Sequence, residues 1–476
     1  MHSTAAGGAG HAVILSTEED TAEILELARS AGYEVLRTFV QKRESPDAEL
    51  YIGKGKVREV ADFLRQLEDS GERWGGRGGR ECVAIFNGSL KPGQVFHLEK
   101  ELGTRVLDRV GLILEIFSRR AGSREARLQV ELARLRYEVP LVREYIHRTR
   151  TGEHPGLFFS GGEYQVDDYY RMIRARMAAI RKELETIGKE RAQRRKTRRR
   201  GGRALVALAG YTNAGKSALF RALTSEDSPV GPELFTTLST TTRRLAEAEG
   251  GGGHTGSGDG TPLARAGGTA AALTGGSWGV QGSRILLTDT VGFIRDLPPW
   301  LIEAFRSTLE EVFLSDVVVV VVDVSDPLEE IQVKTATTLG VLRKGGATVP
   351  VVAAFNKMDL VGREEGMRRA SAIALRHGLQ KYCLTSALDG TGLPELTRLV
   401  IESLDDFFYG TIKGPADEVG RLAREEGLRV SAVAGGMAEV KGALLRNWRV
   451  RSLLTRYPRV SFERGGGTAR ETVAKG

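Results

Sequence analysis

One octapeptide constrains the fold of this 476-residue chain more than any other feature. Gly210-Tyr-Thr-Asn-Ala-Gly-Lys216-Ser217 fits the pattern Gly-x-x-x-x-Gly-Lys-Ser and directly follows an apolar run at 205–209. In this pattern the backbone N–H groups of the turn, and of the helix after it, hold phosphate groups. The alternative is a glycine turn that merely caps a helix, and the preceding apolar run weakens it. We therefore expect a P-loop nucleotide-binding domain.

Apolar runs alternate with helical patterns from residue 204 onward, which is typical of a doubly wound, mostly parallel sheet. The expected strands are 205–209, 240–247, 285–288, 317–322, 349–355 and 382–385. A tract rich in Gly, Ser, Thr and Ala at 249–283 interrupts the pattern and cannot pack a core. We expect this tract to be a mobile insertion between two adjacent strands.

The residues that handle phosphate come from the octapeptide and from a segment that follows the third expected strand. Lys216 would supply a positive charge to the β- and γ-phosphate oxygens, and Ser217 would offer a hydroxyl to Mg²⁺. The sequence Asp289-Thr-Val-Gly292 would place its carboxylate beside Mg²⁺ and its glycine amide near the γ-phosphate, where a Cβ would hinder the approach.

Between these segments, a switch threonine must close on Mg²⁺ and the γ-phosphate. Thr237 is our choice, although Thr236 and the threonines at 240–242 are close by. The expected catalytic residues are Lys216, Thr237 and Gly292, and the expected metal ligands are Ser217, Thr237 and Asp289.

A later motif, Asn356-Lys-Met-Asp359, follows the apolar run 351–355 and predicts the choice of base. A carboxylate at Asp359 can accept hydrogen bonds from guanine N1–H and the 2-amino group, neither of which adenine presents. Asn356 would support the phosphate loop, the Lys357 stem would lie over the ring, and Ser386 and Ala387 would complete the pocket. The expected nucleotide-binding residues are Gly210, Tyr211, Thr212, Asn213, Ala214, Gly215, Lys216, Ser217, Ala218, Asn356, Lys357, Asp359, Ser386 and Ala387.

The rest of the chain predicts three further parts. Residues 1–95 read as a small α/β domain, and 96–200 as a helical hairpin with a basic linker, in which Pro140 breaks the first helix and 166–196 form the second. The nucleotide domain would span 201–405. Residues 406–476 would form a small α+β domain, with helices at 417–426 and 437–448 around a strand at 428–433.

The linker ends in six basic residues among the seven at 194–200. Such a run can be a solvated helix face, or it can contact a nucleic-acid phosphate backbone without reading its sequence. Its place between an α/β domain and a nucleotide domain favours phosphate contact.

Composition excludes several classes of protein. Cys82 and Cys383 are too far apart in the sequence to suggest a disulfide framework or a zinc site. The start of the chain lacks a signal-peptide pattern, its end lacks a lipidation signal, and the apolar run 317–322 is too short to span a bilayer. We expect a cytoplasmic monomer with no membrane partner, which also disfavours a membrane-trafficking GTPase.

Four motifs resemble the HflX family of ribosome-associated GTPases: 51–56 (YIGKGK), 86–94 (FNGSLKPGQ), 128–137 (LQVELARLRY) and 289–293 (DTVGF). The similarity covers roughly 12–405. It implies an N-terminal domain and a helical hairpin that engage the large ribosomal subunit, followed by a Mg²⁺-dependent GTPase domain. Family members split stalled ribosomes into subunits. The segment 158–165 and the insertion at 249–283 depart from the family pattern.

Two mechanistic expectations follow. Many GTPases use a glutamine after Asp-x-x-Gly to orient the attacking water, but Phe293 stands here, so intrinsic turnover should be slow until the ribosome orders the switches. Asn213 resembles potassium-binding residues of related GTPases, or it merely caps the loop.

A GTP-switched RNA-binding or ribosome-assembly factor without splitting activity is the alternative function.

Overall fold

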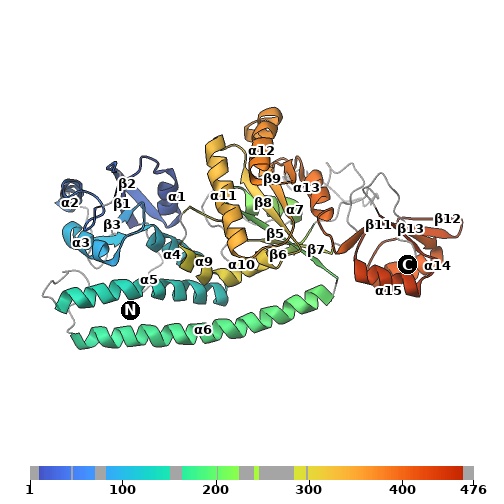
Figure 1. Cartoon of the computed structure of the whole chain (residues 1–476), viewed down its shortest axis with the longest axis horizontal. Helices are drawn as coiled ribbons and strands as arrows, with labels where there is room; N and C mark the ends of the chain where they lie inside the picture. Colours follow the sequence, from blue (N-terminus) through green and yellow to red (C-terminus); the bar gives the residue numbers. More distant parts are fainter. Residues whose placement is uncertain are drawn as a thin grey trace, which may run out of the picture. The chain divides into compact units, whose positions relative to one another are not determined.

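The computed structural model describes residues 10–43, 45, 47–69, 82–150, 163–200, 202–224, 241–245, 284–295 and 298–464. These residues fall into two compact units (Figure 1). The first contains those up to Lys189 together with 298–305, and the second contains the others. The expected insertion at 249–283 lies outside the described residues.

The first unit is built on a four-stranded parallel sheet in the order β2-β1-β3-β4. Its strands are β1 (Gly10–Ser16), β2 (Tyr33–Val40), β3 (Cys82–Phe86) and β4 (Arg105–Leu107), and its helices are α1 (Ala22–Ser30), α2 (Lys54–Asp69), α3 (Pro92–Leu102) and α4 (Arg109–Arg120). All of β3, and β1 after its first residue, are buried, as expected for parallel strands covered on both faces.

Two long helices, α5 (Arg124–Arg150) and α6 (Glu163–Arg200), run side by side (Figure 1). They are antiparallel, because Leu128 near the start of α5 packs on Ile180, whereas Val142 near its end packs on Ile173. The predicted break at Pro140 is wrong, since α5 continues through it. Apolar contacts with α6 on both sides of the proline outweigh the lost backbone hydrogen bond.

The second unit contains a six-stranded sheet in the order β10-β9-β8-β5-β7-β6. Its strands are β5 (Ala204–Gly210), β6 (Thr241–Arg244), β7 (Ile285–Asp289), β8 (Val317–Asp323), β9 (Val351–Asn356) and β10 (Lys381–Leu384), and only β6 is antiparallel to its neighbour. The helices of this part are α7 (Lys216–Thr224), α10 (Arg306–Phe313), α11 (Leu328–Lys344), η1 (Met358–Leu360), α12 (Arg363–His377) and α13 (Leu393–Ile401), while α9 (Pro299–Ala304) belongs to the first unit. The predicted α/β class with a mostly parallel sheet is confirmed.

The last part of the chain forms a β-α-β-β-α-β arrangement with an antiparallel sheet in the order β12-β13-β11-β14. Its elements are β11 (Phe407–Pro415), α14 (Ala416–Glu426), β12 (Ala432–Ala434), β13 (Met437–Arg446), α15 (Asn447–Arg456) and β14 (Ser461–Arg464). The helix predicted at 437–448 is wrong, because most of it is β13. Ala438 and Val440 alternate toward the core there, a period-two pattern that a helix cannot satisfy.

Two ion pairs join this last part to segments that adjoin the six-stranded sheet. The buried Arg446 contacts Asp316, just before β8, at 3.3 Å, and it also contacts the exposed Asp406 at 3.2 Å, with its guanidinium over the Phe407 ring. Arg284, just before β7, pairs at 2.7 Å with the buried carboxylate of Glu426. In the part of the chain that the structure describes, no helix is both long enough and apolar enough to cross a membrane.

Candidate nucleotide-binding site

The phosphate loop connects the end of β5 to the start of α7, at the carboxyl edge of the six-stranded sheet. A methyl group at Gly210 would lie 2.3 Å from the Val321 carbonyl oxygen of β8, so only glycine lets these strands approach. Because α7 begins at Lys216, the first-turn N–H groups of that helix face the loop, as phosphate binding requires.

Asn356 supports the loop from β9. Its Nδ2 donates to the Ala214 carbonyl at 3.0 Å, and its Oδ1 accepts from the Ala387 N–H at 3.1 Å. Gly215, at φ +88°, leaves room for this amide, because a Cβ there would lie 2.2 Å from Nδ2. One buried side chain therefore ties the phosphate loop to the segment expected to close the base pocket.

The residues expected around the base follow β9 and β10. Asp359 is exposed at the start of the η1 turn, so its carboxylate is accessible to a ligand. Lys357 adopts a left-handed backbone conformation (φ +65°) and pairs with Asp323 at 2.6 Å. Ser386 is fully buried, and the Ala387 N–H is held by Asn356. These residues lie at one edge of the sheet with the phosphate loop.

Two of the expected metal ligands face each other. Ser217 Oγ donates to Asp289 Oδ2 at 2.7 Å, and the Asp289 carboxylate is almost completely buried. A hydroxyl and a carboxylate oxygen are the hard donors that Mg²⁺ prefers, so this pair fits the ion. The third expected ligand, Thr237, lies outside the described residues.

Lys216 is buried, and burial lowers the pKa of its ammonium group to about 8, against a smaller opposing effect of Asp289. Its Nζ donates to the Tyr211 carbonyl at 2.7 Å, within the loop that it would serve. Gly292 lies close by, since a methyl group there would be 2.9 Å from Nζ. The positive charge and the glycine amide predicted to hold a γ-phosphate thus meet at one point.

The segment after Gly292 is joined to the phosphate loop by backbone hydrogen bonds. The Phe293 N–H donates to the Gly210 carbonyl at 3.0 Å, and the Thr212 N–H donates to the Phe293 carbonyl at 2.8 Å. The Tyr211 hydroxyl also accepts from the Arg295 N–H at 2.7 Å. Sequence reasoning missed this connection, because no local pattern marks a bridge between residues about eighty positions apart.

Comparison with known proteins identifies the family. Three family models match successive parts of the chain: "GTP-binding GTPase N-terminal" at 18–118, "GTP-binding GTPase Middle Region" at 120–198 and "50S ribosome-binding GTPase" at 205–357. The protein "GTPase HflX" of Thermococcus kodakarensis is 42% identical over 362 residues, covering 75% of this chain and 71% of that protein. The chain belongs to the HflX family of GTPases.

Other family members agree with this result. "GTPase HflX" of Thermofilum pendens is 35% identical over 85% of this chain and 84% of its own length, and that of Chlamydia pneumoniae is 35% identical over 85% and 76%. The predicted resemblance and the predicted GTPase activity are therefore confirmed.

Within this HflX-family chain, the structure brings most predicted nucleotide-site residues to one sheet edge. Asn213 is exposed with φ +63°, and Ala218 is part of α7. Among the described residues, no contact of Asn213 distinguishes a potassium ligand from a loop-capping residue, and both interpretations remain predictions. The individual roles given to these residues remain predictions.

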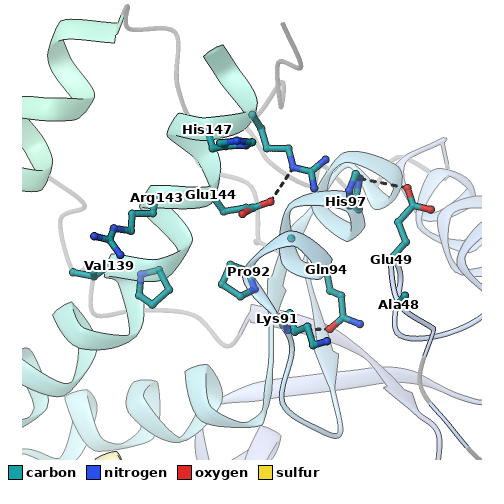
Figure 2. A pocket seen from close by; sticks show the side chains of 13 residues that line it. Ala48, Glu49, Lys91, Pro92, Gln94, His97, Val139, Arg143, Glu144 and His147 are labelled. Carbon is teal, nitrogen blue, oxygen red and sulfur yellow. Dashed lines mark hydrogen bonds and ion pairs between the residues drawn. The ribbon is translucent and has the colours of Figure 1, made fainter. Parts of the chain in front are cut away.

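A separate cavity of about 880 Å³ lies in the first unit, between the start of α3 and α5 (Figure 2). Glu144 pairs with Arg148 at 2.9 Å, and Figure 2 shows His97 directed toward Glu49, at 3.9 Å. The Gln94 amide is also occupied, by the Lys91 N–H and the Asp47 carbonyl. Both lining carboxylates are thus paired within the unit, and none of the predicted nucleotide-site residues lines this cavity.

Proposed function

We propose that this GTPase associates with the large ribosomal subunit and splits or rescues stalled ribosomes. The observation that carries the proposal is the basic end of α6, in a chain whose nucleotide domain matches a family model described as a 50S ribosome-binding GTPase. The basic residues at this helix end would contact the phosphate groups of ribosomal RNA.

The basic end of α6 is accessible. Arg194 and Lys196 are exposed, whereas the neighbouring Arg195 pairs with Glu310 at 3.3 Å and anchors the helix. Arg194 also contacts Glu190 at 3.4 Å, but exposed pairs of this kind are weak and exchange readily for a phosphate. Cations held on a rigid helix favour binding to a phosphate backbone rather than to specific bases.

The nucleotide site favours GTP with Mg²⁺ as the nucleotide whose binding and hydrolysis would accompany ribosome splitting. Ser217 and Asp289 would hold the ion, Lys216 would neutralise the phosphates, and the exposed Asp359 would select guanine. When bound, Mg²⁺ would neutralise charge that develops during transfer of the γ-phosphoryl group to water. A potassium ion at Asn213 would add to this neutralisation, and replacing K⁺ by Na⁺ tests it: an unchanged rate contradicts that role. The place of action would be the cytoplasm.

Sedimentation of intact ribosomes with the protein and GTP tests the proposal. We expect ribosomes to separate into subunits, with the protein on the large one. Co-migration with intact ribosomes would instead favour the alternative, a GTP-switched RNA-binding or assembly factor. Complete absence of binding would contradict both.

Charge variants show whether α6 makes the contact. Arg194→Gln with Lys196→Gln should weaken co-sedimentation and lower its dependence on salt concentration. Arg343→Gln with Lys344→Gln, at the exposed end of α11, removes the same charge elsewhere and is the matched control.

A further inference from the structure

Hydrolysis requires a group that orients the attacking water, and Phe293 cannot serve. Its ring is 3% exposed, and its backbone is bonded on both sides to the phosphate loop, at Gly210 and Thr212. A hydrocarbon ring also offers no hydrogen-bond donor or acceptor. The chain must therefore use another polar group if it turns over GTP without a partner.

Thr212 is the polar side chain best placed for this role. It is the third residue of the phosphate loop, is 6% exposed, and is held by the bond from its N–H to the Phe293 carbonyl. A methyl group at Gly292 would lie 2.8 Å from Thr212 Cγ2 and 2.9 Å from Lys216 Nζ. A γ-phosphate between Lys216 and the Gly292 amide would therefore lie beside the Thr212 side chain.

The neighbouring hydroxyls are already engaged. Ser217 Oγ donates to Asp289, and Thr290 Oγ1 donates to the Leu208 carbonyl at 2.6 Å. For the Thr212 hydroxyl, the described residues provide no hydrogen-bond partner. This hydroxyl can donate and accept, which is what orienting a water molecule requires.

We propose that the Thr212 hydroxyl orients the water that attacks the γ-phosphate. The water oxygen forms a bond to the γ-phosphorus while the bond from that phosphorus to the β–γ bridging oxygen breaks, and GDP leaves. A water proton passes to a phosphate oxygen of the product, so the threonine keeps its own proton. The role concerns intrinsic hydrolysis and does not depend on the ribosomal partner.

Single-turnover hydrolysis by purified full-length protein, without ribosomes, tests this role. Thr212→Val keeps the shape and removes the hydroxyl, and should lower the rate constant about tenfold or more. Thr212→Ser keeps the hydroxyl and should stay within about threefold of the wild type. GTP and GDP affinities, measured by displacement of a fluorescent nucleotide, should change by less than about twofold in both variants.

Thr337→Val is the matched control, since Thr337 is half-buried on α11 and its hydroxyl donates to the Val333 carbonyl of the same helix at 2.9 Å. Three results would overturn the proposal. Thr212→Val could hydrolyse GTP at the wild-type rate, Thr212→Ser could be as slow as Thr212→Val, or the loss of rate could be matched by an equal loss of GTP affinity. The last result would indicate a purely structural threonine.

Discussion

Gly215 and Asn356 are complementary in shape: the Asn356 Nδ2 atom occupies the space 2.2 Å from where a Cβ of residue 215 would lie. Through that nitrogen and its Oδ1, Asn356 joins the phosphate loop to the base-pocket segment. One side chain therefore connects the phosphate loop to the segment expected to close the base pocket, and displacing it should affect phosphate and base binding together.

Gly215→Ala should lower the affinities for GTP and GDP alike, by at least about tenfold, because the methyl group displaces Asn356 and strains a positive φ. Equilibrium binding of both nucleotides checks this. Gly340→Ala in α11, where a Cβ meets open space, is the matched control and should bind normally. A variant that loses GTP but keeps GDP would show that the contact does not organise the whole site.

Asp359→Asn should exchange guanine for xanthine specificity. The carboxylate would accept from the guanine 2-amino group, whereas an asparagine amide can donate to the 2-oxo group of xanthine. We expect GTP affinity to fall about a hundredfold and XTP affinity to rise, which competition binding with the two nucleotides measures. A gain of XTP binding would show that the loss of GTP affinity does not come from misfolding of the variant. Unchanged GTP affinity would place the base elsewhere.

Nucleotide binding should take up a proton above pH 8, because the pKa of Lys216 in the empty site is lowered to about 8 from 10.5. Phosphate oxygens favour the charged ammonium and would raise that pKa again. Calorimetric titration with GDP at pH 8.5, in two buffers of different ionisation enthalpy, should detect the proton. Identical apparent enthalpies would contradict this account.

The same shift affects the stability of the empty protein. Between about pH 8 and 10.5 the unfolded chain keeps the Lys216 proton while the folded chain has released it. The unfolded state then binds more protons, so this residue contributes stability that rises with pH across that window. Lys216→Met should remove this contribution. Chemical unfolding at pH 8 and pH 10 checks this by comparing the free energies of unfolding of the wild type and the variant.

Arg446→Gln should destabilise the second unit by about 3 kcal/mol, because it leaves the partly buried Asp316 carboxylate without its cation. Thermal or chemical unfolding measures this loss. Arg451→Gln, an exposed change on α15, should alter stability by less than about 0.5 kcal/mol. Equal effects of the two substitutions would show that the buried ion pair contributes nothing specific.

The sequence predicted the nucleotide domain well, because its strands are short apolar runs followed by glycine-rich or polar motifs. Val317 to Val322 is such a run, and its residues are buried in the centre of the sheet. The prediction failed where local pattern and tertiary packing disagree. Pro140 suggests a helix end that packing on α6 overrides, and β13 alternates only weakly, with Gly442 at φ +69° interrupting its period.

The nucleotide-site motifs could be read from the sequence, whereas their connections could not. The position of Asn356 at the end of an apolar run predicts that it supports the phosphate loop. The structure shows which atoms its side chain joins. The bridge from Tyr211 to Phe293 depends on which strands are neighbours in the sheet. Motif spacing carries no information about that pairing.

Single-turnover GTP hydrolysis with and without purified large ribosomal subunits shows whether this GTPase depends on the subunit for fast turnover. Because Phe293 cannot orient water and its segment is bonded to the phosphate loop, we expect slow hydrolysis alone and at least about a tenfold acceleration by the subunit. The Arg194→Gln, Lys196→Gln variant should require more subunit for the same acceleration. Equal rates with and without large subunits would show that hydrolysis by this GTPase does not depend on the ribosome.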